Sequence, residues 1–296
     1  MFLGEVELEG YPIRQYRIND LVIGISTQFG PRILQLSPIE NPDLNIFGIL
    51  HDKGVATREG FWNTYGGHRL WSSPEATPRS YSLENTPIQW VEKESSLTLL
   101  GPIEIQNSLQ KEIILEPEGP KGIRITHRLK NIGRWPIRMA CWGLSVMKPN
   151  GFAAIPILPG TVDAEGLLPD RKLVLWPYTD LSDSRLILQK DFLFLRQDPS
   201  KDSPVKIGAT SKPAIAFYHW NFLTFVKKTM ISAGEYPDGG ASFEVYANTD
   251  MLELESLGPL SLIQPDDFIE HIESWNLLKT GPLTPNSKDF YPLINA

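Results

Sequence analysis

Two glutamates separated by a single residue are the side chains in this sequence best suited to acid–base chemistry. Glu253 and Glu255 lie within residues 251–257, where apolar and charged side chains alternate strictly. A period of two is typical of a β-strand, so both carboxyls point to one face, roughly 7 Å apart. Met251 and Leu257 flank them on that face. Apolar surroundings raise a carboxyl pKa toward the working range of a general base, whereas a solvated outer face would leave both groups simply in water.

A second candidate is the segment Gly66-Gly67-His68-Arg69-Leu70-Trp71. In an extended chain Arg69 and Trp71 share a side, which places a planar fork of donors beside a flat apolar ring. This combination suits a sugar, which has hydroxyls on its rim and C–H groups on its faces. In the alternative interpretation Arg69 caps loop carbonyls and Trp71 anchors the loop to the core. His68 is the histidine whose neighbours independently suggest a site.

The other histidines and the single cysteine favour structural positions. The five histidines have no metal-ligand spacing, so the sequence predicts no metal site: His51, His68, His127, His219 and His271. His127 lies on an apolar face and is expected in the core, His219 is expected at a loop tip, and His271 at an ordinary strand position. Cys141 lies in an apolar strand and is expected to be a buried structural thiol.

Composition excludes several classes of function. The chain has 296 residues and a formal net charge of −7, with no basic cluster, so nucleic-acid binding is not expected. No apolar run reaches the roughly 18 residues of a membrane span, and the N-terminus lacks the apolar stretch of a secretory signal. Cys141 has no second cysteine to pair with, and a cytoplasmic location is expected. The sequence has no P-loop and no dinucleotide motif, and no cofactor is expected.

The elements that would position these residues are strands. No helical pattern exceeds about two turns, and the 25 prolines and 23 glycines indicate many short connections. Residues 51–80 lose periodicity and are expected to form a long irregular loop. The pattern predicts one all-β domain over residues 1–296, a large antiparallel two-sheet β-sandwich. The expected strands and short apolar runs are 21–27, 32–36, 45–50, 88–94, 96–100, 105–116, 123–130, 137–147, 152–158, 173–176, 191–196, 214–218, 223–229, 242–247, 252–256 and 267–275.

The late part of the chain resembles the aldose 1-epimerases, or galactose mutarotases. Leu254-Glu255-Ser256, the turn at 265–267 and a final strand with alternating polar residues resemble the C-terminal part of that family. Uncharacterised aldose-epimerase-like proteins are closer still, with fragments resembling GGHRLW, LVLWPYTDL, EYPDGG and ELESLGPL. The resemblance covers the whole chain, through short motifs. It implies an antiparallel sandwich whose concave sheet holds a sugar, with Glu255 as base and Arg69 as a sugar contact. The family's acid histidine has no counterpart in residues 139–147, which read MACWGLSVM.

Two functions follow as hypotheses. In the first, the protein binds an aldose or sugar derivative and interconverts its anomers by acid–base ring opening. Glu255 is then the base and His68 the acid, while Arg69, Trp71, Glu253 and Trp142 contact the substrate. In the second, the protein binds sugar without catalysis, because the family's acid is missing. Glycoside hydrolysis by Glu253 and Glu255 is a third, weaker alternative, since neighbours on one strand cannot flank a bond from opposite sides. The oligomeric state is left open.

Overall fold

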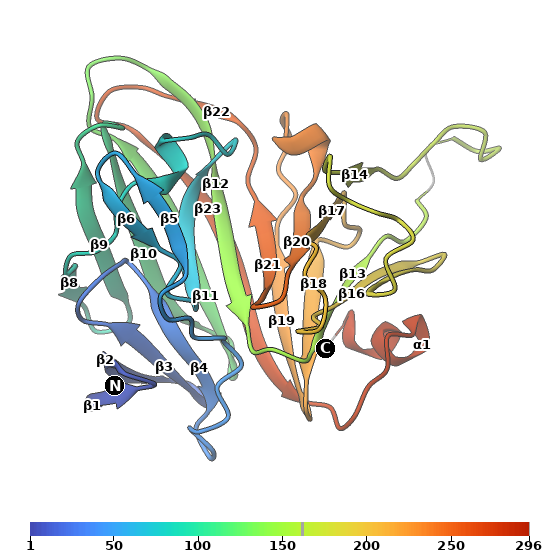
Figure 1. Cartoon of the computed structure of the whole chain (residues 1–296), viewed down its shortest axis with the longest axis horizontal. Coiled ribbons are helices and arrows are strands. Elements are labelled where there is room, and N and C mark those ends of the chain that lie inside the picture. Colours follow the sequence, from blue (N-terminus) through green and yellow to red (C-terminus); the bar gives the residue numbers. More distant parts are fainter. Residues whose placement is uncertain (161–162, 296) are drawn as a thin grey trace.

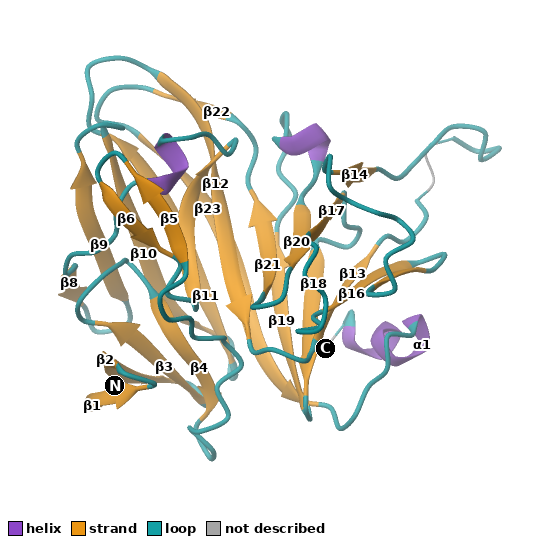
Figure 2. Ribbon diagram, viewed as in Figure 1, coloured by secondary structure: helices purple, strands orange, loops and turns teal. Residues whose placement is uncertain are grey.

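Most of the chain forms two large antiparallel β-sheets (Figures 1 and 2). The computed structural model describes residues 1–160 and 163–295. The first sheet has the order β1 (Phe2–Leu8), β2 (Tyr11–Ile18), β3 (Leu21–Ser26), β4 (Ile33–Pro38), β7 (His68–Ser73), β12 (Ile137–Met147), β21 (Leu252–Leu257), β20 (Phe243–Ala247), β17 (Val205–Ala209) and β14 (Leu173–Leu175), and β22 (Ser261–Ile263) pairs with β12.

The second sheet supplies the other layer. Its order is β15 (Leu186–Leu188), β16 (Phe192–Arg196), β13 (Phe152–Pro156), β18 (Ile215–Trp220), β19 (Leu223–Thr229), β23 (Phe268–Lys279), β11 (Gly122–Asn131), β10 (Leu109–Glu118), β9 (Leu97–Glu104) and β8 (Gln89–Glu92). The remaining elements are the hairpin β5 (Gly54–Thr57) and β6 (Gly60–Asn63), the short helix α1 (Ser287–Phe290) and the 3₁₀ turns η1 (Arg79–Tyr81), η2 (Asp238–Gly240) and η3 (Tyr291–Leu293). Among the described residues, no helix has the length and apolar character needed to cross a membrane.

Alternation places the main core between the two sheets. Leu252 and Leu254 of β21 are fully buried in the same apolar cluster as Ile125 of β11 and Trp275 of β23. The residues that alternate with the two leucines, Glu253 among them, therefore face the opposite side of the first sheet. The predicted all-β, two-sheet fold is confirmed, and β12 and β19 begin and end where the sequence places them. That residues 1–296 form one domain stays a prediction, and residues 161, 162 and 296 lie outside the described part.

Two local predictions are wrong. Residues 51–80 are not one irregular loop, because they include β5, β6 and the central strand β7. The Trp and Gly residues of this segment obscure the alternation that β7 nevertheless has. His219 lies on β18 instead of at a loop tip, and its side chain is only 5% exposed. The turn to β19 comes at residues 221–222.

The register of the central strands sets the geometry of the outer face. Leu144 of β12 pairs with Arg69 of β7 on one side and with Glu255 of β21 on the other. Directly paired residues in antiparallel strands point to the same face, so Arg69 and Glu255 share a face two strands, or roughly 10 Å, apart. Glu255 in turn pairs with Glu244 of β20.

Candidate functional site

A cavity of about 450 Å³ lies on this outer face of the first sheet. Its volume is within the usual range of small-molecule sites. Its walls combine six aromatic rings with charged side chains, and we call it the aromatic cavity. The aromatic and charged residues in its lining are Lys53, Trp62, Arg69, Trp71, Glu75, Tyr81, Trp142, Tyr178, Lys206, Tyr246, Asp250, Glu253 and Glu255.

Five of the six predicted site residues therefore meet at one cavity: Glu255, Glu253, Arg69, Trp71 and Trp142. They come from three neighbouring strands, β7, β12 and β21, whose pairing brings segments far apart in sequence side by side (Figure 1). What each residue does there stays a prediction. Their convergence follows from strand alternation and register, and no loop has to be invoked to bring them together.

Arg69 is held between aromatic rings. Its guanidinium carbon lies 4.5 Å from the ring centre of Trp71 and 5.6 Å from that of Trp62. Its Nη1 is 2.8 Å from Oε1 of Glu253, but without the alignment of a hydrogen bond. Nε and Nη1 have no hydrogen-bond partner among the described residues. A buried donor without a partner costs free energy, so these N–H groups are suited to receive a ligand oxygen.

Glu255 is fixed through one carboxyl oxygen while the other lacks a hydrogen-bond partner. Oε2 accepts a hydrogen bond from Trp142 Nε1 at 2.9 Å and one from Lys206 Nζ at 2.9 Å. Oε1 is buried and accepts no hydrogen bond from an N–H or hydroxyl group of the described residues, and the carboxyl of Glu244 lies within hydrogen-bonding reach of Glu255. Burial raises the pKa of Glu255, Lys206 opposes this rise, and the nearby charge of Glu253 adds to it. An oriented carboxyl with one unpaired oxygen and a raised pKa has the features of a general base.

Lys206 joins Glu255 to a second buried acid, Glu244. Its Nζ lies 2.8 Å from Oε2 of Glu244 and stands over the rings of Trp142 and Trp176, 4.6 Å from each centre. Burial raises the pKa of Glu244 well above its usual value, and Lys206 offsets this only in part. Both Glu244 oxygens are buried without a hydrogen bond of good geometry among the described residues. One ammonium thus serves two buried carboxyl groups.

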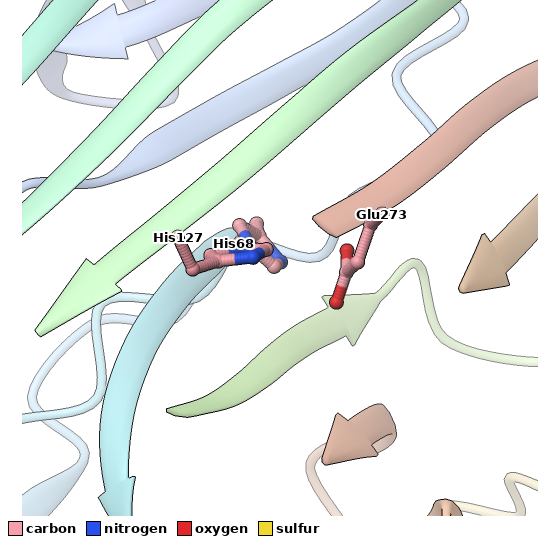
Figure 3. A group of neighbouring side chains, drawn as sticks. All are labelled: His68, His127 and Glu273. Carbon is pink, nitrogen blue, oxygen red and sulfur yellow. The ribbon is translucent and has the colours of Figure 1, made fainter. Parts of the chain in front are cut away.

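His68 does not lie in the aromatic cavity, contrary to the expectation that it joins Glu255 there. It occupies β7 one residue before Arg69, and successive residues of a strand face opposite sides. Its imidazole is fully buried between the sheets, with Nδ1 2.9 Å from Ser145 Oγ and Nε2 2.7 Å from His127 Nε2. Figure 3 shows the side chains of His68 and His127 together with that of Glu273. Burial and the neighbouring His127 lower the pKa of His68 well below its usual value. None of the described residues lining the aromatic cavity is a histidine.

The polar groups around His68 form a network beneath the floor of the aromatic cavity, which we call the buried polar network. Its members are His68, His127, Ser145, Lys227, Ser256, His271 and Glu273. The predicted core position of His127 is confirmed, as is the buried thiol of Cys141. His271 lies on β23 as expected, and it too is buried.

One half of the buried polar network has its proton positions fixed by its partners. His127 Nδ1 must donate to the carbonyl of His271, 3.0 Å away, because a carbonyl only accepts. Burial lowers the pKa of His127, so the ring is neutral and its Nε2 accepts from His68 Nε2. His68 Nδ1 then accepts from Ser145, whose oxygen accepts from Lys227 Nζ at 3.2 Å. Each hydrogen bond in this series therefore has one donor and one acceptor.

The other half centres on Glu273. Its Oε1 contacts Lys227 Nζ at 3.1 Å and accepts from Ser256 Oγ at 2.5 Å, while Oε2 accepts from Trp275 Nε1 at 2.6 Å. Because Ser256 donates to this carboxylate, His271 Nε2 donates to Ser256 at 2.7 Å. Three potential ligand atoms, from His68, His127 and Glu273, do lie within 4.8 Å of one another. They are nevertheless paired with each other or with Lys227, so the arrangement fits a polar core better than a metal centre.

Lys206, Glu244, Tyr178 and Tyr246 were missed from the sequence. Lys206 stands between Val205 and Ile207. Glu244 similarly stands between Phe243 and Val245. A charged residue flanked by apolar neighbours on a strand is the same signal that singled out Glu253 and Glu255. It could have identified both, whereas nothing in the local sequence indicates where the Tyr178 loop folds.

Comparison with known proteins shows the class of fold. No family model matches the sequence, and no curated protein matches it. Among solved structures, the fold is similar to a galactose mutarotase-like protein from Lactobacillus casei, with a TM-score of 0.59, 7% identity and coverage of 90% of this chain and 100% of that one. A galactose mutarotase related enzyme from Lactobacillus acidophilus gives a TM-score of 0.55 at 9% identity, covering 91% and 98%.

A candidate aldose 1-epimerase from Klebsiella pneumoniae is similar to the same extent, with a TM-score of 0.56 at 15% identity over 93% of this chain and 82% of that one. The chain therefore has a galactose mutarotase-like fold. At these identities the likeness establishes the fold alone, and the activity has to be argued from the site.

Proposed function

We propose that the protein binds a free sugar in the aromatic cavity and interconverts its anomers, with Glu255 as the base. The observation that supports this most is the state of the Glu255 carboxyl. Oε2 is held by Trp142 and Lys206, whereas Oε1 is buried and accepts no hydrogen bond from an N–H or hydroxyl group of the described residues. The pKa of Glu255 is raised toward neutral pH, and a general base is most effective when its pKa is close to the pH of the reaction.

The surrounding residues suit the recognition of a sugar. Trp62, Trp71 and Trp142 supply apolar plates for ring C–H groups. The Nε–H group of Arg69 and the Nε1–H groups of Trp62 and Trp71 are buried donors for ring hydroxyls. Glu253 supplies an acceptor beside them.

The reaction then needs an acid for the ring oxygen, and we assign this role to Tyr178. Tyr178 lies in the cavity lining, and its hydroxyl is protonated at neutral pH. Burial raises its pKa to about 12, which makes it a weaker acid, so its proton is transferred only in concert with proton removal by Glu255. Glu255 removes the proton of the anomeric hydroxyl, and the electron pair forms the carbonyl as the bond between the anomeric carbon and the ring oxygen breaks. The ring oxygen takes the proton of Tyr178. Rotation of the aldehyde and reversal of these steps give the other anomer.

Sugar binding without catalysis is the second candidate. The observation in its favour is that no described residue of the cavity lining is a histidine, the residue type most often used as an acid near neutral pH. The protein's location in a cytoplasm stays part of the proposal, and the single, buried Cys141 is compatible with it.

Polarimetry separates the two candidates. Freshly dissolved α-anomers of common aldoses should reach equilibrium faster with the protein, and Glu255→Gln should abolish the acceleration while binding measured by calorimetry persists. Glu7→Gln, on the exposed strand β1, is the matched control and should behave as wild type. Binding without acceleration for every aldose would leave the non-catalytic function, and equal acceleration by wild type and Glu255→Gln would refute the mechanism.

A further inference from the structure

The charges of the aromatic cavity restrict the ligand further. Its described lining contains three cations, and each lies against a carboxylate. Lys53 is 3.0 Å from Asp250, Arg69 is 2.8 Å from Glu253, and Lys206 is 2.9 Å from Glu255. The positive charge that a phosphate or carboxylate on a ligand would need is therefore already neutralised.

Carboxyl groups are in excess over these cations. Glu75 also lines the cavity, and Glu244 lies fully buried next to Glu255 as its cross-strand partner. Oε1 of Glu255 accepts no hydrogen bond from an N–H or hydroxyl group of the described residues. Oε1 of Glu253 and Oε2 of Glu244 contact only the cations Arg69 and Lys206, without the alignment of a hydrogen bond. Carboxylate oxygens in this state favour a ligand that brings N–H donors and positive charge.

We propose that the aromatic cavity recognises an amino sugar, whose ammonium group contacts Oε1 of Glu255 and the neighbouring carboxyl of Glu253 and whose hydroxyls meet Arg69. This inference rests on the proposed function, because it names the kind of sugar that the same cavity takes. It also means that sugar phosphates and sugar acids are rejected. The aromatic walls contribute through the apolar faces of the sugar ring.

The protonation of the site agrees with this charge balance. Burial raises the pKa values of Glu255 and Glu244, because Lys206 alone cannot keep two buried carboxyls ionised. A ligand ammonium beside Glu255 would favour its charged form and release a proton. The groups that act on this pair are Lys206 on β17, Glu253 on β21, Asp238 in η2, the hydroxyls of Tyr178 and Tyr246, and Lys227 beneath the floor.

Isothermal titration calorimetry with matched sugars tests the inference. The probes are glucose, galactose and mannose, their 2-amino counterparts, the N-acetylated forms and glucose 6-phosphate, all at pH 7 and low salt. For at least one pair the amine should bind tenfold or more tighter than the parent sugar, with the N-acetyl form no tighter than the parent and no binding of the phosphate. Titrations in two buffers of different ionisation enthalpy should show proton release with the amine and none with the parent sugar.

Substitution of Glu253 tests whether its carboxyl is responsible for the preference for the amino sugar. Glu253→Gln should reduce the advantage of the amine over the parent sugar at least threefold, whereas Glu7→Gln, on an exposed strand, should leave it unchanged. Equal affinity for each amine and its parent, or binding of glucose 6-phosphate as tight as that of glucose, would overturn the inference and leave the proposed function standing. If no sugar of any kind binds, the proposed function fails together with it.

Discussion

The carboxyl of Glu255 and the ammonium of Lys206 lie 2.9 Å apart in the wall of the aromatic cavity, and Glu244 contacts the same ammonium from the neighbouring strand. All three side chains are almost completely buried. The pair ties β17 to β21 across β20 and places the charge of Lys206 where it affects the proton affinity of both acids. The stability of the fold therefore depends on the charge of Lys206.

Lys206→Met should lower the free energy of unfolding by about 3 kcal/mol at pH 7, since it leaves two buried carboxyls without their cation. The loss should be smaller at pH 5 than at pH 8. Without Lys206 the folded-state pKa values of both acids rise further above their unfolded values, and stability is lost as pH rises through them. Urea denaturation at the two pH values measures this. Lys279→Met, which removes an exposed ion pair with Glu40, should change stability by under about 1 kcal/mol. A Lys206→Met protein as stable as wild type at pH 8 would contradict the assignment.

Arg69→Lys should weaken sugar binding about tenfold even though the positive charge beside Glu253 is kept. Lysine has no planar fork, and it cannot stack between Trp62 and Trp71 as the guanidinium does. Calorimetry with the tightest-binding sugar measures the change. Arg138→Ala, at an exposed ion pair with Glu235, is the control and should bind normally. Unchanged affinity in Arg69→Lys would show that charge alone matters at this position.

Tyr178→Phe should lower the rate constant of anomer interconversion about 100-fold while changing the sugar dissociation constant little. The ring remains as a wall of the aromatic cavity, and only the proton donor is removed. Polarimetry and calorimetry on the same preparation separate the two effects. Tyr291→Phe, outside the cavity lining, serves as control. A variant that interconverts anomers at the wild-type rate would require another acid.

Gly143→Ala should destabilise the protein by about 2 kcal/mol. A Cβ at this position would lie 2.3 Å from Oε1 of Glu273 and 3.4 Å from Cε1 of His127, both in the buried polar network. Glu273 cannot retreat without losing its contacts with Lys227 and Ser256. A urea midpoint equal to that of wild type would mean that the network yields more easily than its hydrogen bonds imply.

His271→Gln should make stability less sensitive to acid. Burial lowers the pKa of His271 from 6.5 to about 3, so the unfolded chain binds more protons than the folded one between these values. The contribution of neutral His271 to the free energy of unfolding is therefore complete above pH 6.5 and is lost as the pH falls toward 3. One such group contributes about 1.4 kcal/mol per pH unit. Unfolding free energies of wild type and variant between pH 6.5 and 4.5 measure the difference in slope, and equal slopes would exclude a buried neutral His271.

The sequence predicts the sheet architecture and five residues of the cavity for the same reason, since both depend on alternation. The pattern at residues 251–257 identifies the faces of Glu255 and Leu254 correctly. Arg69 and Trp71 were correctly placed on one side by the same rule. The same alternation places His68, one residue before Arg69, on the opposite side of the strand. The expectation that His68 joins the cavity depends on residues 51–80 forming an irregular loop, and β7 lies within this segment.

Other features were beyond sequence reasoning because they depend on strand order. β7, β12, β21, β20 and β17 are neighbours in space but follow no simple order along the chain. The convergence of Lys206 and Glu244 on Glu255 could not be known without that order. Lys227 on β19 likewise donates to the carbonyls of Gly143 and Leu254 on strands of the opposite sheet, while Glu273 lies on the neighbouring strand β23.

Consecutive residues of β7 face opposite sides of the sheet, and this limits how the length of this segment can change. Arg69 and Trp71 serve the ligand side, while His68 and Leu70 serve the interior, from consecutive positions. Inserting or deleting one codon just upstream, if β12 kept its pairing partner, would exchange the two sets and push a guanidinium into the hydrogen-bonded interior. A substitution in this strand alters one face of the sheet, whereas a change of length alters both faces at once.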